Sequence, residues 1–192
     1  MREIAAWRST QLSLAKNDRS AAGSVSRRIA AACGTPIDYV QSDVYDAPAA
    51  LADRTFDLVF TGVGALCWLP DVRRWARTVA GLLRPGGELF IREGHPVLWA
   101  MDDPRPDGLL VLAYPYFETE GVPFSESDTY VSQDAPLDSP EIVHFNHGLA
   151  EIFTAIWEAG MEITMFDEHD SVPWNALGDQ MHDIGGGEFR LI

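Results

Sequence analysis

The chain of 192 residues has few cysteines, no long apolar run and few lysines. Its only two cysteines, Cys33 and Cys67, have neither metal-ligand spacing nor a partner pattern, so we expect two free thiols and a reducing, cytoplasmic location. No run approaches the ~18 apolar residues of a membrane span, so we expect no membrane partner. One lysine stands against thirteen arginines, which we interpret as an effect of codon composition.

Positive charge is also scarce in the C-terminal half. The formal net charge is −15, and residues 101–192 carry two basic and nineteen acidic side chains. This half would repel phosphate backbones, so we expect no nucleic-acid partner. Hydrophobic residues make up 46% of the chain, which at this length supports one sizeable domain rather than two.

The most informative stretch is residues 56–99, whose pattern predicts strand, loop, helix, turn and strand. Residues 56–60 form a short apolar run, as in a strand buried on both faces. Apolar residues at helical spacing predict a helix over 72–83, opened by the preceding proline and aspartate. Residues 85–87 (Pro-Gly-Gly) predict a tight turn, and residues 88–92 a second parallel strand.

Other elements are predicted by shorter patterns. Alternation indicates strands at residues 37–41, 109–114, 116–117 and 161–166, whereas residues 1–34 contain no strand-like apolar run. An apolar stripe predicts a further helix between Asn146, a candidate cap, and Gly160.

A long proline-rich and aromatic connection lies between these elements. Such a connection is usually a functional lid or a disordered segment, and the aromatic content favours a lid at about residues 96–147. We therefore divide the chain into an N-terminal segment, residues 1–34, and one domain, residues 35–192, that contains this insertion.

Residues 35–180 resemble the class I S-adenosylmethionine-dependent methyltransferases, through FDLVFTGVGALCWLPD, LLRPGGELFIREGHPVLW and HGLAEIF. The resemblance implies an α/β fold with a doubly wound, mostly parallel, Rossmann-like sheet and antiparallel C-terminal strands. It implies S-adenosylmethionine as cofactor and a small molecule as methyl acceptor. It places the cofactor's adenine at Asp43 and the backbone of Val44. It places the methionine end at Thr61, Gly62, Val63 and Gly64.

The N-terminal segment departs from the family pattern. Residues 1–33 contain one glycine, Gly23, and match neither the family's first strand nor its glycine-rich loop nor its ribose-binding carboxylate. We therefore expect an N-terminally incomplete domain that binds S-adenosylmethionine weakly. The alternative is a catalytically inactive, methyltransferase-like remnant or binding protein.

Three side chains have both a functional and a structural interpretation. Asp43 could accept a hydrogen bond from adenine, or cap the turn at residues 44–48. Trp68 could line the substrate pocket, or pack against the start of the following helix. His95 could bind the substrate and act as the catalytic base, because imidazole titrates near neutral pH, or could be a structural loop histidine.

Two further histidines raise a second alternative, a metal-assisted hydrolase. His144 and His147 have the spacing of one helix face and could bind a metal together with Asp167, His169 or Asp170. This pattern is nonspecific, so we predict no metal. The sequence predicts neither the methyl acceptor nor the oligomeric state.

Overall fold

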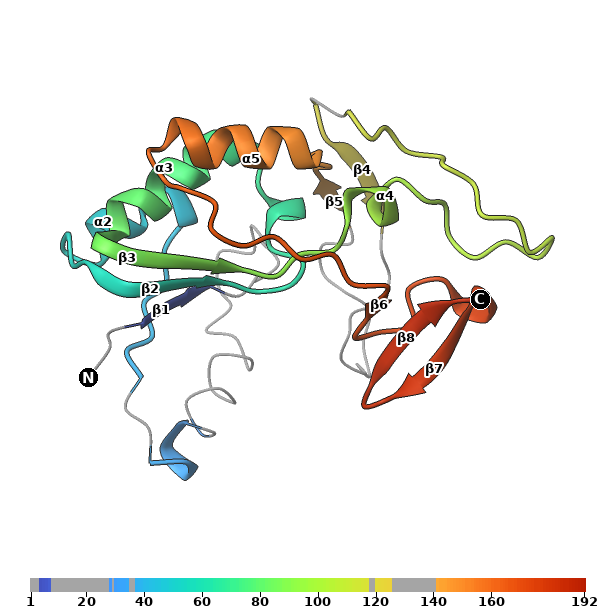
Figure 1. The fold of residues 1–192 in the computed structure, drawn as a ribbon, viewed down its shortest axis with the longest axis horizontal. Helices are drawn as coiled ribbons and strands as arrows, with labels where there is room; N and C mark the ends of the chain where they lie inside the picture. Colours follow the sequence, from blue (N-terminus) through green and yellow to red (C-terminus); the bar gives the residue numbers. More distant parts are fainter. Residues whose placement is uncertain (1–3, 8–27, 29, 35–36, 118–119, 126–140) are drawn as a thin grey trace.

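The computed structural model describes residues 4–7, 28, 30–34, 37–117, 120–125 and 141–192. Its main sheet has three parallel strands in the order β1-β2-β3, namely β1 (Ile4–Trp7), β2 (Phe56–Thr61) and β3 (Leu83–Ile91). Figure 1 shows the carboxyl ends of these strands pointing towards the elements formed by residues 96–147.

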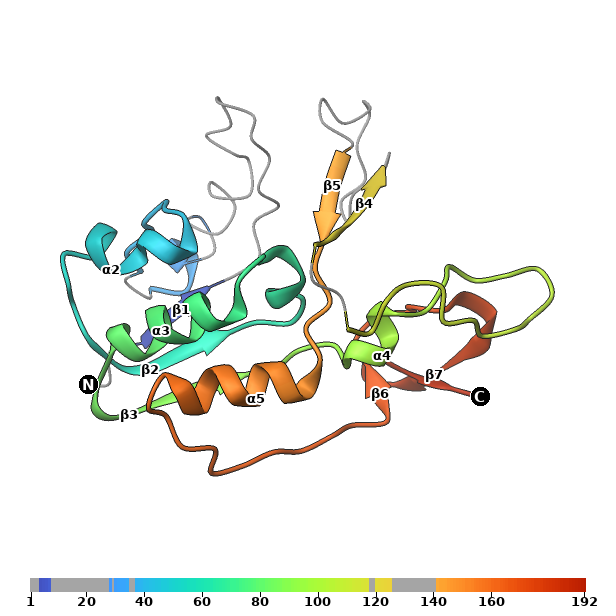
Figure 2. The ribbon, with the colours of Figure 1, turned by 90° about the horizontal axis from the view of Figure 1, so that it is seen from above.

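The predicted strand–helix–strand unit is confirmed. Between β2 and β3 lies α3 (Val72–Leu82), whose first turn is capped by Asp71 through an Oδ1 contact of 2.8 Å from the backbone N–H of Arg74. The predicted later helix is α5 (Leu149–Glu158), and it packs beside α3 on the same face of the sheet (Figure 2). The buried face of α3 carries the main core side chains, Val72, Trp75, Ala76, Val79 and Leu82.

The prediction that residues 1–34 hold no strand is wrong. The backbone of Ile4 pairs with Leu58, and the register continues in parallel to Trp7 opposite Thr61. A strand can form without an apolar run here because its hydrogen bonds are backbone bonds to the open edge of β2. In the methyltransferase pattern this place, beside the fourth strand, belongs to the first strand. Residues 8–27, which follow β1 in the sequence, lie outside the described residues.

Four other predicted strands do not form. Residues 37–41 and 161–166 lie in no sheet, and residues 109–117 contribute one isolated bridge, between Met101 and Leu112. The alternation at 161–166 is nevertheless meaningful, because Met161 and Ile163 pack against the core. A strand also needs a neighbouring backbone in register, and alternation does not supply one.

The predicted Pro-Gly-Gly turn is part of β3 instead. Leu83 pairs with Phe56, and Glu88 pairs with Leu58, so four residues of β3 loop out against one of β2. Gly86 takes a φ of +76°, and a Cβ on Gly87 would lie 2.9 Å from the carbonyl oxygen of Phe56. The glycines therefore allow a bulge that brings the two strands back into register.

The remaining elements are not strands of the main sheet. The insertion forms α4 (Pro96–Trp99) and an antiparallel pair, β4 (Val122–Ser125) with β5 (Glu141–His144). The smaller elements are η1 (Val44–Asp46), α2 (Ala47–Ala50), η2 (Leu66–Trp68) and η3 (Gly178–Gln180).

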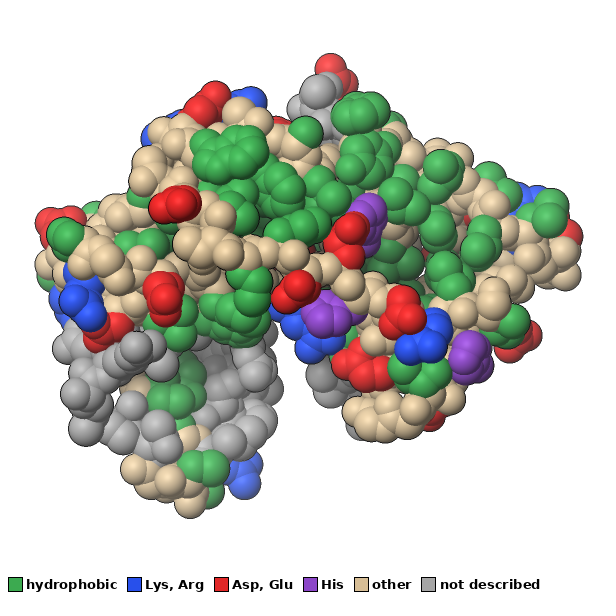
Figure 3. Space-filling model, in the orientation of Figure 1, with side chains coloured by type: hydrophobic (Ala, Val, Ile, Leu, Met, Phe, Trp, Pro, Cys, Tyr) green, Lys and Arg blue, Asp and Glu red, His purple; other side chains and the backbone are tan. Residues whose placement is uncertain are grey.

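Antiparallel C-terminal strands are present, but in a separate sheet and without the predicted strand at residues 161–166. Its order is β6-β8-β7, with β6 (Ser171–Val172), β7 (Met181–Gly185) and β8 (Glu188–Leu191). None of the described helices has the length and apolar character needed to cross a bilayer. Apolar side chains continue onto the surface over α5 (Figure 3), where Trp157 is 58% exposed.

Candidate active site

A half-buried carboxylate, that of Glu93, holds the loop that follows β2. Glu93, two residues after β3, accepts hydrogen bonds from the backbone N–H groups of Gly64 at 3.0 Å, Ala65 at 2.6 Å and Leu66 at 3.4 Å. The first bond uses Oε2 and the other two use Oε1. One side chain therefore ties the carboxyl end of β3 to the carboxyl end of β2, where open α/β folds bind their ligands.

The environment of Glu93 changes its ionisation. Burial raises the pKa of the Glu93 carboxyl from 4.5 to about 7, against the opposing effect of the backbone hydrogen bonds from Ala65, Leu66 and Gly64. The sequence interpretation did not select Glu93. The available signal was an acidic residue directly after the end of a predicted parallel strand.

The four residues predicted to meet the methionine end of the cofactor lie in and after the last position of β2. Thr61 is 1% exposed, and its Oγ1 has no hydrogen-bond partner within the described part of the chain. Gly62, Val63 and Gly64 follow, half-buried. At Gly64 φ is +71° and no atom lies within 4 Å of where a Cβ would be, so the loop leaves open space beside its backbone.

Asp43 has the structural role that was one of its two interpretations. Its Oδ1 accepts the backbone N–H of Tyr45 at 2.9 Å and caps η1, whose first residue is Val44. The Tyr45 hydroxyl in turn lies 3.0 Å from the backbone nitrogen of Asp71, which fixes η1 against the start of α3. Capping uses only one carboxylate oxygen, so the adenine role of Asp43 and Val44 stays a prediction.

His95 uses both of its ring nitrogens. Nδ1 accepts the backbone N–H of Val97 at 3.1 Å and caps α4, and Nε2 lies 3.1 Å from Oε1 of Glu168. Because Nδ1 accepts a hydrogen bond, the ring proton is on Nε2, which donates a hydrogen bond to the Glu168 carboxylate. This arrangement gives His95 a structural role; its predicted catalytic and substrate-binding roles remain predictions.

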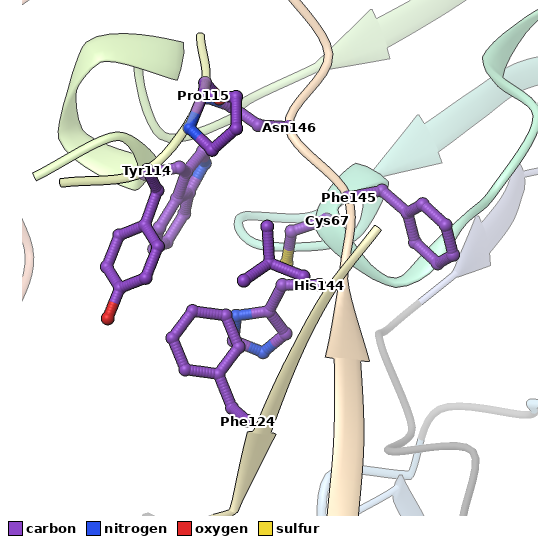
Figure 4. A pocket seen from close by; sticks show the side chains of 9 residues that line it. Cys67, Tyr114, Pro115, Phe124, His144, Phe145 and Asn146 are labelled. Atoms are coloured by element: carbon purple, nitrogen blue, oxygen red, sulfur yellow. The ribbon is translucent and has the colours of Figure 1, made fainter. Parts of the chain in front are cut away.

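The insertion forms a pocket with the loop after β2, which we call the aromatic pocket (Figure 4). The empty space in and at the mouth of this pocket, open solvent included, is about 330 Å³. Its walls are Cys67, Trp99, Tyr114, Pro115, Val122, Phe124, His144, Phe145 and Asn146. The backbone N–H of Phe145 donates to the carbonyl oxygen of Cys67 at 2.8 Å, which fixes the insertion against η2.

Trp68, for which a substrate contact was one of two interpretations, packs against His144, a residue of this pocket. Its indole ring lies edge-on to the imidazole of His144, with ring centroids 4.6 Å apart. The ring of Phe124 also packs against His144, with the two ring centroids 4.9 Å apart. Burial lowers the pKa of the His144 imidazole, which favours its neutral form. The sequence interpretation considered His144 only as a metal ligand.

The histidines do not assemble a metal centre within the described residues. His147 has both ring nitrogens engaged, Nε2 with the carbonyl oxygen of Leu69 at 2.7 Å and Nδ1 with Glu151 at 3.1 Å. No group of three His, Cys, Asp or Glu side chains in the described ranges is placed to hold a metal ion.

Comparison with known families agrees with this arrangement. Residues 3–91 match the family model described as a methyltransferase domain. This part of the chain is therefore similar to a methyltransferase domain. The match includes β1 and the rest of residues 3–34, which we had left outside the resemblance. A search of the curated proteins finds no match.

Proposed function

We propose that the protein transfers a methyl group from S-adenosylmethionine to a small-molecule acceptor. The observation that carries this proposal is the match of residues 3–91 to a methyltransferase domain. The loop after β2 supports it, because that loop lies at the carboxyl edge of the parallel sheet and is fixed there by Glu93.

The residues of this loop fit the cofactor. The buried Thr61 hydroxyl lacks a partner among the described residues and would gain one from a polar group of the ligand. The open space beside Gly64 allows a ligand to approach the backbone. Asp43 and Val44 would meet the adenine, and Thr61, Gly62, Val63 and Gly64 the methionine end.

The cofactor supplies a methyl group that its sulfonium already activates. The chain then has to bind and orient the acceptor and exclude water, because alignment of the reacting atoms supplies much of the rate. Glu93 contributes by holding residues 64–66 in one conformation. The aromatic pocket, which begins at Cys67 directly after that loop, is the proposed place for the acceptor.

The test is binding of S-adenosylmethionine, measured by saturation-transfer NMR with S-adenosylhomocysteine as competitor. We expect transfer to both the adenine and the methionine protons. Thr61→Val keeps the side-chain shape and should weaken binding by roughly three- to tenfold, through loss of one hydrogen bond. Thr78→Val, which alters a buried threonine inside α3, is the matched control and should leave binding unchanged. Absence of any competed signal would refute the function.

A further inference from the structure

The aromatic pocket has the composition and the position of a specific acceptor site. We propose that it binds a single, uncharged, planar ring that carries a hydroxyl group, and that the imidazole of His144 accepts the hydroxyl proton. The inference rests on the methyl-transfer function proposed above and names the class of its acceptor.

The position follows from chain connections at the carboxyl edge of the sheet. Cys67 lies three residues after Gly64, and its Sγ donates to the Gly64 carbonyl oxygen at 3.4 Å. Trp99, another lining residue, belongs to α4, which follows β3 and Glu93. A ligand in the pocket therefore lies next to the loop proposed to hold the reactive end of the cofactor.

The lining selects against charged acceptors. Among the nine lining residues there is no Asp, Glu, Lys or Arg, and the titratable side chains are Cys67, Tyr114 and His144. A carboxylate or an ammonium group would lose its hydration without gaining a countercharge. The acceptor is therefore a neutral molecule.

The arrangement of the rings selects for a flat acceptor. Phe124 lies 4.9 Å from His144 and 5.0 Å from Tyr114, with interplanar angles of 43° and 58°. Rings that meet at such angles leave aromatic faces and edges for a further ring. The empty space of about 330 Å³ includes open solvent, so the enclosed part is smaller and we expect one ring rather than several.

His144 supplies the polar contact. Its Nε2 is buried without a hydrogen-bond partner among the described residues. A neutral imidazole has one nitrogen that can accept a proton. In the transfer, the acceptor oxygen bonds the methyl carbon while the carbon–sulfur bond breaks and its electron pair stays on sulfur. The hydroxyl proton moves to His144, and the products are a methyl ether, S-adenosylhomocysteine and an imidazolium.

The experiment measures binding of simple probes in the absence of cofactor. Phenol, anisole and benzoate are titrated into the labelled protein, and the indole N–H signal of Trp99 reports entry into the pocket. We expect phenol to bind roughly three- to tenfold more tightly than anisole, which lacks the O–H group, and benzoate not to bind. In His144→Phe the preference for phenol over anisole should disappear, whereas His182→Phe, an exposed control, should keep it.

Each other outcome overturns part of the proposal. Equal binding of phenol and anisole to the wild type would exclude the role of His144. Binding of benzoate would exclude the selection for neutral acceptors. Absence of phenol binding would exclude the pocket as the acceptor site, while the cofactor test above would still stand. Since His144→Phe could fail to fold, the imidazole signals of His144 in the wild type give a second readout, which should shift with phenol and not with anisole.

Discussion

Replacing Glu93 with glutamine should change how stability depends on pH. The folded-state pKa of about 7 lies above the ordinary value of 4.5, so between these values the folded state binds the extra proton. Stability therefore falls as pH rises through this window, and is constant above it as far as this group is concerned. At about 1.4 kcal/mol per pKa unit, ionisation of Glu93 costs the fold about 2 kcal/mol between pH ~5.5 and neutrality.

The Gln side chain of the Glu93→Gln variant does not titrate, so the stability of the variant lacks this dependence on pH. The assay is urea unfolding of both proteins from pH ~5.5 to ~8.5, a range that stays above the sequence pI of about 4.5. The variant loses the acceptor for the Gly64 N–H, which destabilises it at every pH. The difference in free energy of unfolding between variant and wild type should nevertheless shift by about 2 kcal/mol in favour of the variant as the pH rises. Glu162→Gln, at an exposed position, is the control. If the curves of Glu93→Gln and the wild type run parallel, the reasoning about Glu93 is refuted.

Further predictions concern the core, a helix cap and cofactor affinity. Trp75→Ala removes a fully buried ring of α3 and should cost about 3–5 kcal/mol in urea unfolding, whereas Trp157→Ala, 58% exposed, should cost far less. Asp71→Ala removes the cap of α3 and should cost about 1 kcal/mol in the same assay, and no loss would mean that the Arg74 contact is dispensable. Calorimetry should give a millimolar rather than micromolar Kd for S-adenosylmethionine, because several hydrogen bonds of about 0.5–1.5 kcal/mol each are expected to be missing. A micromolar value would show that residues 1–34 supply these contacts by another route.

Elements with local signals were predictable from the sequence. The helix α3 has a capping aspartate, a proline before it and an apolar stripe, all within about a dozen residues, and each signal agrees with the others. The helix α5 also has an apolar stripe, and Gly160 ends it with a φ of +81°, but its N-cap is Gly148 and not the predicted Asn146. The central strand β2 was predictable because burial on both faces leaves an apolar run.

Elements that depend on a distant partner were not predictable. The strand β1 is only four residues long and pairs with residues more than fifty positions away, so its backbone bonds leave no mark on its own sequence. Residues 161–166 show the converse, since they alternate as a strand does but have no sheet neighbour. The site divides in the same way. The loop at Thr61 and Gly64 follows from the end of β2, whereas the Glu93 contacts and the position of His144 arise from tertiary packing.

The most direct test of the account is methyl transfer itself. The protein is incubated with S-adenosylmethionine labelled with carbon-13 at its methyl group, at a concentration suited to weak binding, together with phenol, and the products are followed by NMR. The account predicts a labelled methyl ether that forms with the wild type and with His182→Phe and is strongly reduced with His144→Phe. Binding of both ligands without any labelled ether, from phenol or from other single-ring phenols, would contradict it.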